Sequence, residues 1–200
     1  MPLTQCVFQY VVSDEMNKEG GVARISAGHA HTMAVTKAGN VWVFGCGLFG
    51  QLGNGSNKKS TLPVRVEFSS AIDGRGLPDP IDLIACGYFH NYALSTDRQR
   101  LYTWGCNPQL LRIEAQQKKR ERMECMKRAE SEEGGEGSKE EAQIEDGREM
   151  LHLIPSLLDM SAVEGTIEAV ACGNQHTIIL TAMGEVYTFG RNVDGQLGES

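Results

Sequence analysis

Pairs of aromatic residues alternate with smaller residues in three short segments of the chain, and each segment ends at a glycine. The segments are 41–45, 101–105 and 186–190, and they hold the pairs Trp42 with Phe44, Tyr102 with Trp104, and Tyr187 with Phe189. Because successive side chains on a β-strand point to opposite faces, both members of a pair lie on one face. The pattern predicts three strands, each offering an aromatic face for packing.

Further strands are predicted around each aromatic strand. Runs rich in small and apolar residues occupy 22–27, 81–86 and 167–172, and shorter runs follow at 33–35 and 177–180. The shorter runs are too brief to be helices, and glycine-containing turns at 37–40 and 182–185 predict hairpins. A fourth strand can begin at Pro63 and again at Pro155, since proline is tolerated at the first residue of a strand. Four strands per unit is the number in a propeller blade.

The same unit therefore occurs three times, and glycines and histidines mark its positions. Each unit opens with Gly-x-x-His, and a glycine closes the aromatic strand. Units one and three continue into Gly-Gln-Leu-Gly, whereas unit two has Asn107-Pro108-Gln109-Leu110. The marker residues are Gly28, His31, Gly45, Gly50, Gly53, Gly87, His90, Gly105, Gly173, His176, Gly190, Gly195 and Gly198. We expect structural roles for all of them: turns or close backbone approaches for glycine, and backbone hydrogen bonds for histidine.

This combination of motifs resembles the repeats of the regulator of chromosome condensation family. The resemblance covers most of 22–68, 81–107 and 155–198. The family folds as a β-propeller, normally of seven blades, so the resemblance implies an all-β chain that forms a partial β-propeller of about three four-stranded blades. Because a closed propeller needs at least ~4 blades, we expect the chain to be a fragment, or a truncated product, of a longer repeat protein.

The repeats suggest a division of the chain. We assign 22–68 to repeat one, 81–159 to repeat two and 167–200 to repeat three, which is incomplete. Residues 1–21 are an N-terminal strand and linker, and their strand is a candidate for the end of a preceding blade. Repeat two contains an insertion at 111–150.

The insertion is charged and changes sign along its length. Residues 112–128 hold seven basic and three acidic residues, and residues 129–149 hold nine acidic and two basic ones. Good helix formers without glycine or proline predict a solvated helix in the first part, and the second part has the composition of a disordered segment. The basic group Lys118, Lys119, Arg120 and Arg122 is a candidate partner-binding or nuclear-import patch. The alternative is a solvated helix whose charge is offset by the acidic part.

The motifs suggest a dinucleotide-binding site and a histidine metal site, but the sequence around them argues against both. Gly45-x-Gly47-x-x-Gly50 matches a dinucleotide-binding turn, but such a turn needs a helix directly after it, and the residues after Gly50 are helix breakers. The recurring histidines fall one per blade, so they are not expected to converge on one metal ion. We therefore predict no catalytic residues, no cofactor, no metal, no small-molecule substrate and no enzymatic activity.

Composition narrows the partners and the location. The formal net charge of −7 argues against a protein devoted to nucleic acid. No run of apolar residues is long enough for a membrane span, and the N-terminus lacks the pattern of a secretory signal. The six cysteines show no metal-binding spacing and fit thiols in a reducing compartment. We expect an intracellular location, cytoplasmic rather than nuclear.

The resemblance also implies a function. It favours a protein-interaction or scaffold module of a larger intracellular regulatory protein. The first alternative is guanine-nucleotide exchange on, or regulation of, a small GTPase, which needs no catalytic nucleophile. The second is a module that recruits substrates to a ubiquitin ligase. Chromatin binding through the basic segment is the least favoured hypothesis.

Overall fold

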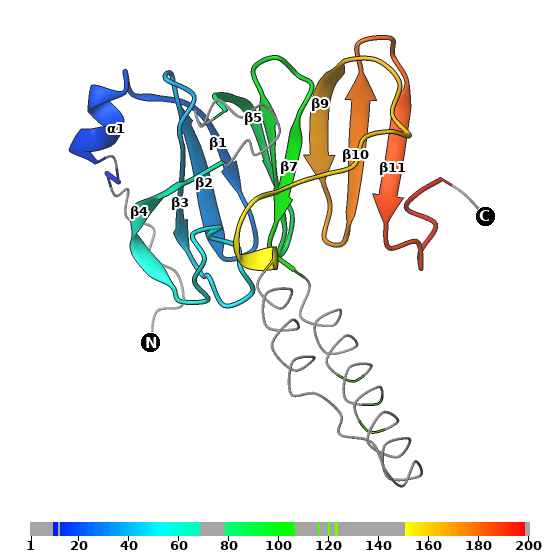
Figure 1. The fold of residues 1–200 in the computed structure, drawn as a ribbon, viewed down its shortest axis with the longest axis horizontal. Helices are drawn as coiled ribbons and strands as arrows, with labels where there is room; N and C mark the ends of the chain where they lie inside the picture. Colours follow the sequence, from blue (N-terminus) through cyan, green and yellow to red (C-terminus); the bar gives the residue numbers. More distant parts are fainter. Residues whose placement is uncertain are drawn as a thin grey trace, which may run out of the picture.

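Three antiparallel β-sheets stand side by side in the computed structural model (Figure 1), which describes residues 10–11, 13–68, 79–106, 116, 120, 123 and 151–198. The strand order follows the sequence in each sheet. The first sheet contains β1 (Val22–Ala27), β2 (His31–Thr36), β3 (Val41–Gly45) and β4 (Ser60–Val66). The second contains β5 (Ile81–Cys86), β6 (Asn91–Ser95), β7 (Leu101–Trp104) and β8 (Ser156–Leu157). The third contains β9 (Ile167–Cys172), β10 (His176–Thr181) and β11 (Val186–Gly190). The predicted all-β architecture of successive blades is confirmed.

The closing glycine of the aromatic strand lies beside the histidine of the Gly-x-x-His motif. His31 is the register partner of Gly45, and His176 is the partner of Gly190. Gly45 has a φ of 109°, and a Cβ built on it would lie 2.5 Å from the carbonyl oxygen of Ala30. Only glycine accommodates both the backbone conformation and the close approach, so this register depends on it.

The apolar core lies between the sheets and not within any one of them. Between the first and second sheets, Met33 and Val43 pack against Ala93, Tyr102 and Trp104. Between the second and third sheets, the buried cluster includes Tyr92, Leu94 and Ile179, with Tyr187 and Phe189 packed against it. The aromatic pairs of β7 and β11 thus face the preceding sheet, and these sheets bury their apolar side chains only because a neighbour is present.

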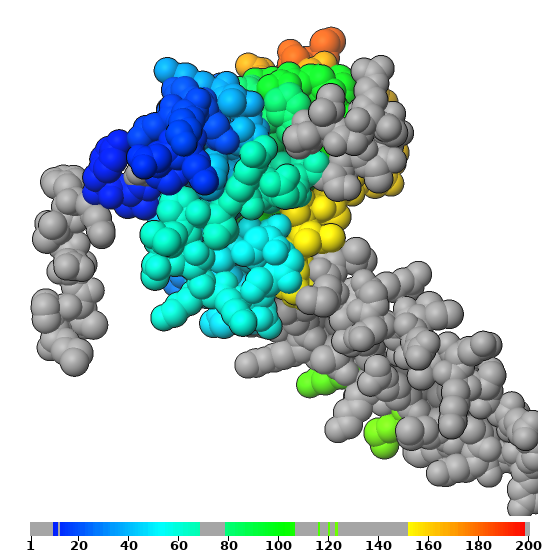
Figure 2. Space-filling view, turned by 60° about the vertical axis from the view of Figure 1, so that its left-hand side comes forward, coloured from blue at the N-terminus to red at the C-terminus, as the bar shows by residue number. Residues whose placement is uncertain are grey.

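A short helix that the sequence pattern did not predict precedes the first sheet. Helix α1 (Asp14–Lys18) is capped by Ser13, whose side chain accepts a hydrogen bond from the Met16 amide, and it carries acidic residues in its first turn. Met16 is buried against Ala34 and Trp42. Figure 2 shows α1, in dark blue, seated directly on the first sheet. The strand predicted before it lies outside the described residues.

The strand directions place all the repeat motifs at one end of the sheets, the lower end in Figure 1. We call this end the loop face; its described segments are 28–30, 46–59, 87–90, 105–106, 173–175 and 191–198. The tight turns at 37–40, 96–100 and 182–185 lie at the opposite end. The chain leaves the second sheet from the loop face after Cys106 and returns through the 3₁₀ helix η2 (Leu151–Leu153).

Of the insertion 111–150, the structure describes Gln116, Arg120 and Met123, which are helical and exposed. The helical and disordered predictions for the remainder of the insertion fall outside the described residues.

Candidate functional site

A buried hydrogen-bond network joins the first and second sheets at what we call the first junction. Nε2 of His31 donates to Oδ1 of Asn91 at 2.6 Å, and Nδ2 of Asn91 donates to the carbonyl oxygen of Gln51 at 2.9 Å. The indole N–H of Trp104 donates to the same carbonyl at 3.0 Å. All four residues are almost completely buried. Because unpaired polar groups are costly inside a protein, this network specifies how the two sheets fit together.

The Gly-Gln-Leu-Gly motif fills the first junction. We call residues Gly50–Gly53 the plug. The Leu52 side chain is fully buried in the core cluster that contains Trp104, and the Gln51 side chain accepts a hydrogen bond from the Phe49 amide at 2.8 Å. Gly50 and Gly53 both have a positive φ, 79° and 62°. The motif is therefore a tight turn that inserts a leucine between two sheets, a role that its recurrence in the sequence did not reveal.

The imidazole of each repeat lies over the glycine three residues before it. A Cβ on Gly28 would come within 2.1 Å of the His31 ring, and the corresponding distance is 2.3 Å for Gly87 with His90 and 2.1 Å for Gly173 with His176. Burial lowers the pKa of His31, and it also lowers the pKa of His90, with smaller contributions from His31 and His176. Within the described residues, no group of three or more acidic, histidine or cysteine side chains could hold a metal ion.

The second junction, between the second and third sheets, contains an open groove of about 610 Å³ on the loop face. We call it the groove. Its lining residues are Phe89, His90, Tyr92, Thr103, Gly105, Cys106, Asn174, Gln175, His176, Thr177, Phe189, Gly190 and Arg191. This volume falls within the usual range for ligand-binding sites in proteins.

The groove occupies the place that corresponds to the plug of the first junction. Met33, Val43 and Trp104 belong to the cluster that contains Leu52, and their counterparts one repeat later are Tyr92, Thr103 and Phe189. All three counterparts line the groove. Repeat two is the repeat whose sequence lacks Gly-Gln-Leu-Gly. The residues that stand in its place, 107–110, lie outside the described residues.

An aromatic patch lies on the loop face beside the groove, and we define it as Leu48, Phe49, Tyr88, Phe89 and the ring of His29. The His29 and Tyr88 rings stack with centroids 3.9 Å apart, and Phe89 contacts Tyr88 and Phe49 edge to face. Leu48 is 62% exposed. Phe89 also lines the groove, so the patch and the groove form one continuous surface.

The interpretation of Gly45-x-Gly47-x-x-Gly50 as part of a repeat, not a nucleotide site, agrees with the structure. The chain from 46 to 59, which is described throughout, contains turns and no helix. A dinucleotide turn requires a helix N-terminus at this point to hold the pyrophosphate. In the basic group, Arg120 is helical and exposed, whereas Lys118, Lys119 and Arg122 lie outside the described residues. Partner binding by this group stays a prediction.

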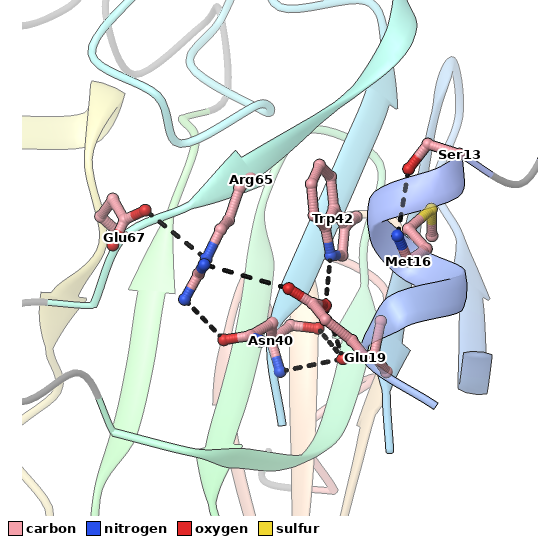
Figure 3. A network of polar contacts seen from close by, with 8 residues as sticks. Ser13, Met16, Glu19, Asn40, Trp42, Arg65 and Glu67 are labelled. Carbon is pink, nitrogen blue, oxygen red and sulfur yellow. Dashed lines mark hydrogen bonds and ion pairs between the residues drawn. The ribbon is translucent and has the colours of Figure 1, made fainter. Parts of the chain in front are cut away.

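A second polar network, at the edge of the first sheet, was not predicted from the sequence. A carboxylate oxygen of Glu19, just after α1, accepts hydrogen bonds from Thr36 and from the indole of Trp42, both at 3.0 Å (Figure 3). Asp79, just before β5, accepts from the Tyr102 hydroxyl in the same manner. In the sequence, both sites are marked by an acidic residue two or three positions before the first strand of a repeat: Glu19 before β1 and Asp79 before β5. Both networks tie the chain between repeats to the aromatic strand.

Comparison with protein families identifies the repeat. A model described as "Regulator of chromosome condensation (RCC1) repeat" matches residues 38–94, and a second model of the same description matches 22–51, 81–109 and 167–196. The matched segments span the Gly-x-x-His motifs and the aromatic strands of all three sheets.

Known proteins resemble the chain over most of its length. RCC1 domain-containing protein 1 of Mus musculus is 31% identical over 99% of the chain, which spans 52% of that protein. The X-linked retinitis pigmentosa GTPase regulator homolog of Caenorhabditis elegans is 30% identical over 88% of the chain, which spans 13% of it. Among solved structures, human WBSCR16 has a TM-score of 0.57 at 21% identity, covering 85% of this chain and 33% of that one. Prp20p of Saccharomyces cerevisiae has a TM-score of 0.53 at 21% identity, covering 84% and 33%.

Proposed function

The chain belongs to the family of regulator of chromosome condensation (RCC1) repeats, and on this premise we propose that its loop face binds a protein partner as part of a larger regulatory protein. The chain spans about half the length of the mouse relative and much less of the worm relative. A binding role suits a propeller because loops at the ends of the blades can vary while the sheets hold them in place.

The aromatic patch is the observation that carries the proposal. Partly exposed aromatic residues that lie together are typical of protein interfaces. In this patch the His29 ring is exposed, and Phe49, Tyr88 and Phe89 are half-buried. His29, Tyr88 and Phe89 come from two different repeats yet form one stacked group. None of these three residues belongs to the buried cluster around Trp104 and Ala93 that joins the first and second sheets.

Site-specific cross-linking tests the proposal. A photoreactive phenylalanine derivative replaces Tyr88 in the chain, and cross-linked proteins from cells are identified by mass spectrometry and then tested for binding as purified proteins. The double substitution of Tyr88→Ala and Phe89→Ala should weaken the binding of a partner so identified by about tenfold or more.

Met183 supplies the matched control. It is an apolar residue that is 80% exposed in the turn between β10 and β11, at the opposite end of the sheets. A cross-linker at Met183 should not capture the same partner, and Met183→Ala should leave its affinity unchanged. Equal effects of substitutions at both ends, or no effect of the Tyr88 and Phe89 substitutions, would refute binding through the loop face.

As a finer role, we propose regulation of a small GTPase as an alternative to a scaffold. The worm relative is named as a GTPase regulator homolog, and the chain aligns with it over 88% of its own length. A panel of purified small GTPases loaded with a fluorescent nucleotide provides the measurement. Faster nucleotide release with the chain present, lost on substitution of Tyr88 and Phe89, would support exchange. A stable complex without faster release would favour a scaffold, including one that recruits substrates to a ligase.

A further inference from the structure

We propose that the groove at the second junction is a peptide-binding site that accepts a leucine-bearing segment of the partner protein. The inference rests on the proposed function, because it names what part of a partner the loop face would hold. The first junction shows the kind of occupant that fits. There the plug inserts Leu52 between two sheets and buries it completely.

The walls of the groove are suited to an aliphatic side chain. Phe89, Tyr92 and Phe189 provide apolar surface on both sides, and the rings of Tyr92 and Phe189 lie edge to face with centroids 6.0 Å apart. Burial raises the pKa of Tyr92, and the neighbouring side chains of Thr177 and Thr103 act in the opposite direction. Because the hydroxyl already has these polar neighbours, an apolar side chain can enter without isolating it.

The groove also differs from the first junction in a way that bears on the ligand. Asn91 and Trp104, which donate to the backbone of the plug, are replaced one repeat later by Thr177 and Phe189. The second junction therefore offers fewer donors for a buried backbone carbonyl and relies more on apolar contact. At the rim, Arg191 donates a hydrogen bond to the Gln175 side chain at 3.0 Å. A polar rim around an apolar floor is the usual build of a peptide anchor pocket.

The sequence of repeat two argues against the chain filling the groove itself. The plug needs glycine at two positions, because Gly50 and Gly53 adopt a positive φ that other residues rarely take. Between Gly105 and Gly134 the sequence contains no glycine, and Pro108 follows soon after the aromatic strand. The tight turn that carries Leu52 into the first junction cannot be copied by these residues without strain. We therefore assign the groove to a segment of the partner protein.

A peptide of this chain serves as the probe. A fluorescent synthetic peptide of residues 47–55, Gly-Leu-Phe-Gly-Gln-Leu-Gly-Asn-Gly, carries the plug sequence, and its binding to the chain is measured by fluorescence anisotropy. We expect saturable binding. A control peptide with Leu52→Asp should bind about tenfold or more weakly, because a carboxylate cannot enter an apolar site without losing its hydration.

Two substitutions in the chain locate the binding site. Thr103→Phe fills the groove from β7 and should weaken peptide binding by about tenfold or more. Thr188→Phe makes the same change at the corresponding position of β11, which does not line the groove, and should leave binding unchanged. Circular dichroism of both variants checks that the sheets are retained. If Thr103→Phe binds the peptide as tightly as the unaltered chain, or if no saturable binding occurs, the proposal is wrong.

A third variant tests whether the chain itself fills the groove. Leu110→Asp changes the leucine of 107–110, the segment that stands in place of the plug. Binding of the peptide only to this variant would show that the chain fills its own groove and would overturn the proposal. A failure of peptide binding combined with intact cross-linking at Tyr88 would remove the groove as a site while leaving the proposed function in place.

Discussion

Asn91 shows how one residue can carry the fit between two repeats. Its side chain accepts from His31 in one sheet and donates to Gln51 in the loop that plugs the junction, and it is completely buried. In the other two repeats the same position is threonine, at Thr32 and Thr177. A threonine hydroxyl cannot span both partners in this way, so the network is specific to the first junction.

The contribution of Asn91 can be measured directly. Asn91→Ala leaves the His31 N–H without its acceptor and should lower the free energy of unfolding by about 1–3 kcal/mol. Urea unfolding of the chain provides the measurement. Asn174 is the control, because it is exposed, and Asn174→Ala should change stability by no more than about 0.5 kcal/mol. Equal stability of the two variants would show that the network adds nothing.

At the scale of elements, α1 illustrates a helix that depends on its tertiary contacts. It comprises five residues, far fewer than an isolated helix needs in water. Its cap at Ser13 and its charges favour the helical turn. Two tertiary contacts hold it in place: Met16 packs against Trp42, and Glu19 accepts a hydrogen bond from the Trp42 indole (Figure 3). Arg65 of β4 adds contacts with Glu19 and Asn40.

Removing the Met16 side chain should therefore release α1 from the sheet. Met16→Ala should lower the free energy of unfolding by about 2 kcal/mol, at the low end for a buried methionine because the helix lies at the edge of the fold. Tryptic cleavage after Lys18 should become faster. Asn17→Ala, an exposed change in the same helix, should affect neither quantity. If Met16→Ala is cleaved at the unaltered rate, packing of this residue does not hold the helix.

At the scale of the whole molecule, contacts between sheets decide stability. Asp82 of β5 pairs with Arg24 of β1 and with Arg98, which in turn donates to the backbone carbonyls of Ile167 and Glu168 in β9. This chain of contacts links all three sheets, although partial exposure makes each ion pair modest. Two titratable histidines lie at the junctions: His31 in the buried network of the first and His90 in the lining of the groove at the second.

The stability of the chain should consequently fall in mild acid. Burial lowers the pKa of His31 and of His90 from 6.5, so both stay neutral in the folded chain at pH values where the unfolded chain takes up protons. Nδ1 of His31 is buried and has no hydrogen-bond partner within the described part of the chain, which disfavours its protonation. Proton uptake by the unfolded state lowers stability as the pH drops below the unfolded pKa.

Urea unfolding between about pH 7.5 and about pH 5.5 measures this effect. The free energy of unfolding should not change at the upper end of this range and should decrease below about pH 6.5. The double substitution of His31→Gln and His90→Gln should flatten the dependence in this range. The lowered pKa values of Asp97 and Asp159 act only at lower pH, where their carboxylates protonate, so they do not obscure the result. An unchanged slope in the double variant would contradict the assignment to these two histidines.

Sequence patterns foretold much of this architecture, and for a clear reason. The alternation around Trp42, Tyr102 and Tyr187 reflects local backbone geometry, which a sequence records directly. The predicted start of a strand at Pro63 was wrong, because β4 already begins at Ser60. The positive φ at Gly45 is likewise a local demand that selects glycine. The register of the sheets follows from these positions, since a shift by one residue would turn every aromatic side chain to the wrong face.

The candidate site could not be read from the sequence in the same way. Leu52 and Gln51 appeared only as members of a recurring motif, and nothing local shows that they enter a junction with Asn91. The groove arises from a comparison across two junctions, because Tyr92, Thr103 and Phe189 lie close together only after the sheets have packed. Helix α1 escaped prediction because five residues carry too little periodicity to be recognised.

The sequence by itself determined the strands, the repeat and the family, since these depend on residue spacing along the chain. The tertiary structure alone decided what the repeat motifs do between sheets. It made the Gly-Gln-Leu-Gly loop a plug in the first junction, and it formed a groove at the second, where the sequence lacks this motif. The physical reason is that each blade buries its apolar face only against a neighbour, so the plug and the groove lie between repeats and not within them.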